Sequence, residues 1–135
     1  MALPNGAGGY QLGDGNLNEI TLGYGAAPQT ATSTATLTAA QITGGILVAN
    51  PSTSAATYTL PLATDIDNVV TSAKVGSTFD LSIVNLGTTS GTVTLAVNTG
   101  VVDGGNALVA IAVTSSAQYR FRRTAAGAWS VYRLG

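Results

Sequence analysis

The chain has 135 residues, of which 45% are apolar and 8% charged, with a formal net charge of −1. This length suits one domain that buries about two-thirds of its unfolded surface. The charge balance argues against a general nucleic-acid binder, which needs a basic face. The lack of cysteine and histidine excludes disulfides, thiolate chemistry and imidazole acid–base catalysis.

The charged fraction is about a third of the usual share of a soluble protein. Charged, mixed surfaces oppose association, so we expect much of this neutral surface to face other protein. The alternative is a monomer that tolerates a surface with few charged residues. The first nine residues lack the basic start and apolar run of a secretory signal. No window reaches membrane-spanning length, so we expect synthesis in the cytoplasm and no membrane partner.

Residues 1–28 predict an extended N-terminal arm, and residues 29–135 predict one β domain. Residues 1–15 are rich in glycine and have no hydrophobic periodicity, which is typical of a segment without a core of its own. Residues 18–24 alternate briefly and could form an edge strand. Residues 29–37 are nearly all Thr, Ala and Ser, which predicts an edge strand or a segment ordered by a neighbouring subunit.

The next part of the chain predicts two helical segments and two strands. Thr38 and Gln41 have the spacing of a capping box, which predicts a short helical turn. Residues 46–49 and 56–60 predict short strands. Residues 61–73 have apolar residues at helical spacing and predict the one helix of more than a turn, with Asp65 and Asp67 near its positive N-terminal end.

The clearest pattern in the chain lies in residues 76–98 and predicts a β-hairpin at the centre of the core. Apolar residues alternate with polar ones on both sides of a Gly-Thr-Thr-Ser-Gly turn, which is the period of a half-buried strand. The apolar positions that we expect to face the core are Phe79, Leu81, Ile83, Val93, Leu95 and Val97.

The C-terminal third predicts three further strands. Residues 107–113 are apolar on both faces, as in a strand covered on both sides, whereas residues 118–124 alternate and residues 129–134 form the last strand. Short strands separated by Gly, Ser and Asn turns predict an all-β, jelly-roll-like sandwich or barrel with one short helix. No fixed-period repeat is visible, which argues against a solenoid.

The acidic residues predict no catalytic pair. Asp65 and Asp67 are two apart on the predicted helix and therefore point to different sides, so we assign them to the helix dipole. Residues 14–19 place oxygen ligands at alternate positions, as at the start of a calcium loop, but the glycine and glutamate that such a loop needs are missing. We predict a turn there, no metal, no cofactor and no enzyme.

Positive charge is confined to the second half of the chain. No Lys or Arg precedes Lys74, and the last 16 residues contain Arg120, Arg122, Arg123 and Arg133 among aromatic residues. This mixture could stack single-stranded bases, but four arginines are few for that task. Contact with an acidic protein surface, where Arg is often a hot spot, and a solvated outer sheet face both remain open.

Several strings resemble the small structural proteins of tailed phages. They are LTAAQI (37–42), GILV (45–48), ATYTLP (56–61), VGSTFDLSIVN (75–85), FRR (121–123) and WSVYR (129–133). The string GYQLGDGN (9–16) resembles the arms of capsid decoration, or cement, proteins. This resemblance implies a jelly-roll-like subunit, a homotrimer, and a place on the outer surface of the virion capsid, with no catalytic residues to carry over.

We therefore expect a non-enzymatic protein that stabilises a phage capsid by bridging neighbouring subunits of the major capsid protein. The alternative is a trimeric tail-fibre or receptor-binding module that contacts host glycan or protein, and a carboxylate-based glycan hydrolase ranks third. The candidate partner-binding residues are Leu3, Tyr10, Leu12, Leu17, Ile20 and Leu22 in the arm, and Arg120, Arg122 and Arg133 in the domain.

Overall fold

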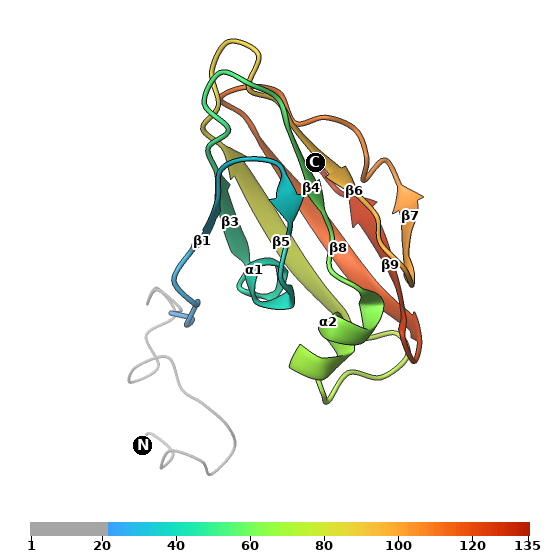
Figure 1. Ribbon diagram of the computed structural model, residues 1–135. Coiled ribbons are helices and arrows are strands. Elements are labelled where there is room, and N and C mark those ends of the chain that lie inside the picture. The colour runs from blue at the N-terminus through green and yellow to red at the C-terminus, as the bar shows by residue number, and fades with distance from the viewer. Residues whose placement is uncertain (1–21) are drawn as a thin grey trace, which may run out of the picture.

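The computed structural model describes residues 22–135, which form two packed β-sheets with two short helices beside them (Figure 1). The chain is mostly strand with little helix, which confirms the prediction of a β-rich fold. The six-stranded sheet has the order β1 (Gln29–Ala31), β3 (Ile46–Ala49), β5 (Thr78–Asn85), β8 (Ser116–Ala125), β9 (Ala128–Arg133), β7 (Val101–Gly105). The three-stranded sheet has the order β2 (Ala35–Thr36), β4 (Ala56–Thr59), β6 (Val93–Ala96).

The first six strands alternate between the two sheets. Each strand lies parallel to the one two places earlier, so β1, β3 and β5 pair in one sheet and β2, β4 and β6 in the other. This coiled winding was not predicted. In register, Gln29 is paired with Leu47, 18 residues on, whereas Ile46 is paired with Ser82, 36 residues on. Because the turns of the coil differ so much in length, no sequence repeat marks them.

The predicted hairpin in residues 76–98 is wrong. The strands exist, but β5 pairs with β3 and β8, while β6 pairs with β4 in the opposite sheet. The turn carries the chain across the sandwich, so the two strands face each other through side chains and share no hydrogen bonds. Period-2 alternation is the same in both arrangements, because each strand needs one buried face in either case. Val97, predicted to be in the core, lies beyond β6 and is exposed.

Asn85 fixes this crossing turn from inside the protein. Its buried side-chain amide donates to the carbonyls of Gly91, Ile111 and Ala112, and its carbonyl accepts from the Gly87 N–H at 2.8 Å. Buried backbone polar groups need hydrogen-bond partners, and among these four only the Ile111 carbonyl also bonds a strand, through the Val93 N–H at 3.1 Å. The Asn85 amide therefore ties the crossing turn to the segment around Ile111.

The predicted strand at residues 107–113 is also wrong. This segment is a loop that touches β6 through one isolated bridge, between Ile111 and Val93. Its apolar residues divide between the core, which takes Ala107 and Ile111, and the surface, where Leu108 and Val109 are exposed. The edge strand of this region is β7, which the sequence did not predict.

Other local predictions are confirmed. Helix α1 (Ala39–Thr43) begins at Thr38 with both bonds of the capping box, and the strands at β3, β4, β8 and β9 match their predicted ranges closely. Helix α2 (Ala63–Val69) is shorter than the predicted 61–73 and begins after Leu62. Residues 22–24, the described part of the predicted first edge strand, form no strand.

The core lies between the facing sides of the two sheets. Side chains alternate along the longer strands, as in β5, β6 and β8, so each sheet has one buried inner face. The stack of Phe79 on Phe121, with ring centroids 4.8 Å apart, and the edge contact of Phe79 with Trp129 mark the end near α2. The largest fully buried side chains are Trp129, Tyr58, Tyr119, Phe121, Ile42, Leu47, Leu60, Ile66, Leu81, Ile83, Leu95 and Ile111.

Candidate functional site

The predicted arm contacts fall mostly outside the described residues. Leu3, Tyr10, Leu12, Leu17 and Ile20 belong to residues 1–21, so their role stays a prediction. Leu22 is described and is 82% exposed, and Tyr24 beside it is fully exposed. Figure 1 shows the segment that carries them leading away from the body of the protein, ahead of β1.

The side of the six-stranded sheet that faces away from the second sheet, here called the outer face, is exposed or half-buried. Residues directly opposite each other in neighbouring strands share a face, so the register defines its members. They are Thr30, Ile46, Val48, Thr78, Asp80, Ser82, Val84, Ser116, Gln118, Arg120, Arg122, Ser130, Tyr132 and Val102. Ten of these fourteen are hydroxylated or aliphatic.

The outer face has three charged side chains. Arg120 lies opposite Asp80, and its Nε and Nη2 atoms donate to the two carboxylate oxygens at 2.8 and 3.1 Å. The hydrogen bond from Arg120 lowers the pKa of the Asp80 carboxyl, and that bond raises the pKa of the Arg120 guanidinium. Arg122 lies opposite Thr78 and Ser130 and has no acidic partner within the described residues. The face therefore has a single uncompensated positive charge.

The structure separates Arg133 from the other two candidate arginines. It pairs with Tyr119, whose side chain faces the core, so it lies on the inner side of β9. Its Nη1 atom donates to the carbonyls of Val109 and Ala110 at 3.0 and 3.3 Å. Arg133 thus tethers the 106–115 loop. Its role in partner binding stays a prediction.

Asp67 makes more contacts than its predicted helix-dipole role needs. From α2 it accepts hydrogen bonds from the Trp129 indole at 2.8 Å and the Gly127 N–H at 2.7 Å, and Arg123 forms an ion pair with it. Burial alone would raise the pKa of this carboxyl, but the bonds from Gly127, Trp129 and Arg123 outweigh burial and lower it. These partners are 56 to 62 residues away in sequence, so no local pattern could have revealed them.

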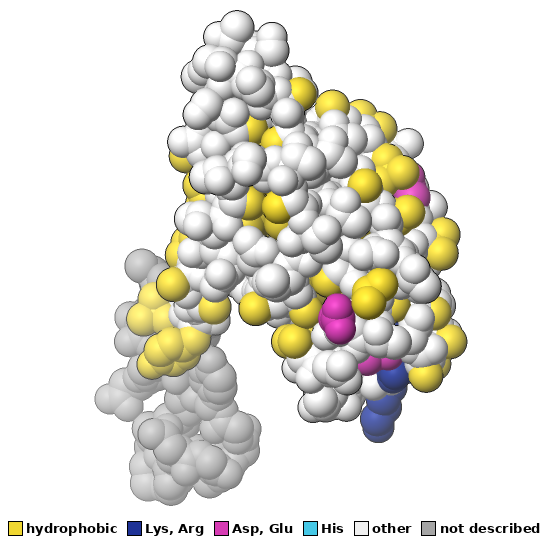
Figure 2. Space-filling view, in the orientation of Figure 1, with side chains coloured by type: hydrophobic (Ala, Val, Ile, Leu, Met, Phe, Trp, Pro, Cys, Tyr) yellow, Lys and Arg dark blue, Asp and Glu magenta, His cyan; other side chains and the backbone are white. Residues whose placement is uncertain are grey.

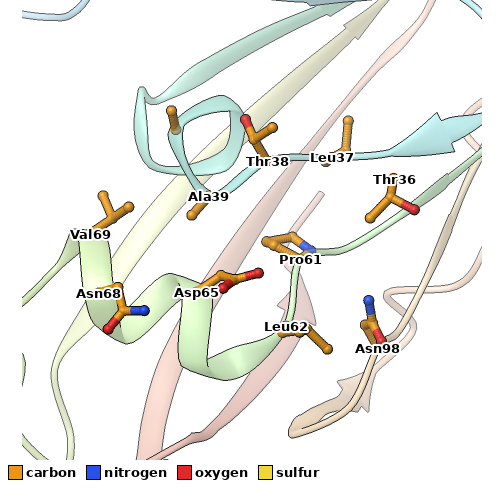
Figure 3. A pocket seen from close by; sticks show the side chains of 11 residues that line it. Thr36, Leu37, Thr38, Ala39, Pro61, Leu62, Asp65, Asn68, Val69 and Asn98 are labelled. Carbon is orange, nitrogen blue, oxygen red and sulfur yellow. The ribbon is translucent and has the colours of Figure 1, made fainter.

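A hollow between the two helices, here called the α1–α2 groove, was also missed. It has a volume of about 670 Å³ and is shown in Figure 3. One side is the start of α1 with the preceding chain, and the other is α2. Its lining is largely apolar, and Asp65, Asn68 and Asn98 provide polar groups.

The carboxylates of the described residues offer no paired acid and base. Asp67 and Asp80 are held by the partners above, and Asp103 accepts from the N–H groups of Gly105 and Ala107 at 3.0 Å each. Within residues 22–135, no three His, Cys, Asp or Glu side chains lie close enough to hold a metal ion. The calcium-like residues 14–19 lie outside the described part.

Comparison with protein-family models, with curated proteins and with solved structures found no match to this chain. In the described part of the chain, both helices are too short to cross a membrane.

Proposed function

We propose that this chain is a non-enzymatic virion protein that decorates and stabilises a tailed-phage capsid. It binds the outer surface of the capsid as a homotrimer and bridges neighbouring subunits of the major capsid protein. The sequence resemblance to cement proteins suggests this role, and the surface of the β domain supports it.

The outer face is the observation that carries the proposal. Interfaces are depleted of charge at their centres because each charged group must lose its water. On this face Asp80 and Arg120 neutralise each other, and most other side chains are neutral. A wide sheet surface of this kind loses little hydration energy when it meets another protein. Arg122 adds one charge that suits an acidic spot on the partner.

The low charge extends beyond that face. Figure 2 shows the opposite side of the sandwich, where charged side chains are few. Most of them lie near α2, one acidic side chain lies apart at the right edge, and most of the surface is uncharged. An isolated protein gains solubility from interspersed charges. A protein that functions packed among capsid subunits needs fewer surface charges. Many copies that bind together offset the weakness of each single contact.

The jelly-roll-like fold is part of the same proposal. Two packed sheets, which jelly rolls also have, support it. Jelly rolls are antiparallel, whereas five of the seven strand pairs described here are parallel. We therefore propose a relationship in overall architecture, with a different winding of the first six strands.

Cosedimentation tests the capsid role. Purified chain is mixed with capsids assembled without it, and separately with host cells, and the bound fraction is measured. We expect saturable binding to capsids and none to cells. Binding to cells alone would contradict the proposal and favour the receptor-binding alternative.

A matched pair of variants tests the outer face. Ile46→Glu together with Arg122→Glu places two negative charges on this face at exposed positions. We expect capsid affinity to fall by about tenfold or more, equivalent to 1.4 kcal/mol, with an unchanged melting temperature. Val75→Glu, at an exposed position outside the sheets, is the control. Equal affinity of the two variants would contradict the assignment of this face.

A further inference from the structure

The α1–α2 groove is open to a ligand of extended shape. Thr38 and Ala39 line one side, Asp65, Asn68 and Val69 line the other, and Pro61 lies between them (Figure 3). Leu62 and Val69 on its rim are 38% and 50% exposed. The volume of about 670 Å³ lies within the range of sites that bury small ligands or a few side chains.

Residues 22–28 provide an unpartnered apolar segment in the same chain. Leu22 and Tyr24 are exposed, and the segment makes no hydrogen bond to residues 29–135. In Figure 2, hydrophobic side chains gather where this segment leaves the body. Its sequence, LGYGAAP, has no charge and only small residues around the two large ones, so it can lie close to another surface.

The groove and the segment match in chemistry. Leucine and tyrosine side chains suit the apolar lining. The Asp65 carboxylate is exposed and accepts no hydrogen bond within the described residues. A tyrosine hydroxyl is a donor that such a carboxylate can accept, while Asn68 and Asn98 can bond the backbone of an extended peptide.

The geometry favours the segment of another copy over that of the same chain. Strand β1 is joined to the middle of α1, where Gln41 Nε2 donates to the Thr30 carbonyl at 2.9 Å. The groove lies at the start of α1, on its α2 side. Pro28, directly before β1, favours an extended backbone at Ala27. Figure 1 shows the segment ahead of β1 leading away from α2, which forms the other side of the groove.

We propose that residues 22–26 of one copy occupy the α1–α2 groove of the next copy. Leu22 and Tyr24 enter the apolar part, and the Tyr24 hydroxyl donates to Asp65. Such a contact joins two different surfaces, so it is head-to-tail and closes into a ring when the rotation between copies permits. The inference builds on the homotrimer of the proposed function and does not depend on capsid binding.

Cross-linking in the native chain tests this contact. The protein has no cysteine, so Gly25→Cys and Ala40→Cys introduce the only thiols, beside Tyr24 and on the groove wall. A Cβ at Gly25 meets nothing within 4 Å, and Ala40 is exposed. The chain with both substitutions is treated with a short bismaleimide and separated on a denaturing gel.

We expect covalent species of several chains, with the trimer as the largest. Cross-links confined to single chains would overturn the proposal, because they place the segment in its own groove, and the absence of any cross-link would overturn it as well. A mixture of the two singly substituted chains should give cross-linked dimers. Gly25→Cys with Leu108→Cys, on a distant exposed loop, is the control and should give none.

Two further variants distinguish this specific contact from non-specific association through exposed apolar residues. Tyr24→Ser and Ala40→Gln should each raise the concentration needed for half-assembly by about tenfold or more, whereas Val75→Ser should leave it unchanged. Equal effects of all three would overturn the proposal. Because the readout involves only copies of this chain, a failure of capsid binding leaves this result untouched.

Discussion

Removing the Asp67 carboxylate should strongly destabilise the protein. In Asp67→Ala, the Trp129 indole N–H and the Gly127 N–H lose acceptors at 2.8 and 2.7 Å, and Arg123 loses its ion-pair partner. A hydrogen bond to a charged group contributes about 1.5–3 kcal/mol, and breaking a largely buried pair costs about 3–5 kcal/mol. The Asp67 side chain is 20% exposed, so water can partly replace it, and the contributions do not add fully.

We therefore expect Asp67→Ala to lower the free energy of unfolding by about 3–5 kcal/mol, or the melting temperature by roughly 10–20 °C. Urea unfolding followed by fluorescence measures this directly, because Trp129 is the only tryptophan and lies at the altered site. Asp65→Asn, two residues earlier on the same helix and exposed, is the matched control. It should cost less than about 1 kcal/mol. Equal losses in the two variants would refute the anchoring role of Asp67.

The pH dependence gives the same prediction an independent test. The folded-state pKa of Asp67 is lowered from its ordinary value of 3.8, so the unfolded state binds the proton more readily. The stability that the carboxylate contributes is therefore fully present well above pH 3.8 and is lost as the pH falls below 3.8 towards the folded-state pKa. The difference between wild type and Asp67→Ala should shrink over that window. A difference that stays constant down to pH 2 would show that the charge is not responsible.

Three other substitutions probe features that the fold depends on. Asn85→Ala removes the buried amide that bonds Gly87 and Gly91 in the crossing turn and the carbonyls of residues 111 and 112. It should cost about 3 kcal/mol or more in urea unfolding, whereas exposed Asn68→Ala should cost less than about 0.5 kcal/mol. Thr38→Ala removes the capping box of α1 and should cost about 1 kcal/mol by thermal unfolding; no change would mean that tertiary contacts alone hold this turn. Phe79→Ala removes a ring that stacks on Phe121 but is only half-buried, so we expect about 2–4 kcal/mol, and a smaller loss would show that the stack adds little.

Local structural features could be predicted from the sequence because their physical causes lie in neighbouring residues. The capping box depends on two side chains three residues apart, and both of its bonds are present. The alternation in residues 118–124 comes from one buried face, and Ala117, Tyr119 and Phe121 are indeed in the core. In such cases the residues themselves contain the physical reason for the structure.

The pairing of the strands could not be predicted from the sequence pattern. An alternating strand specifies that one face is buried, but not which sheet buries it or which strand lies beside it. The segments before and after the turn at residues 86–92 therefore fitted a hairpin and a crossing turn equally well. The apolar run at residues 107–113 misled for a similar reason, because a loop that closes the sandwich can bury every fourth residue without joining a sheet.

The sequence by itself determined the β-rich class, the low surface charge, the lack of histidine and cysteine chemistry, and most strand positions. Tertiary structure alone decided the alternating path between the sheets, the burial of Asn85 and the contacts of Asp67. It also placed Arg120 and Arg122 on the opposite side of the sheet from Arg133. It also created the α1–α2 groove, whose lining comes from segments as far apart as Thr36 and Asn98. These features depend on contacts between residues that are far apart in the sequence. A local sequence pattern does not specify which of those residues meet.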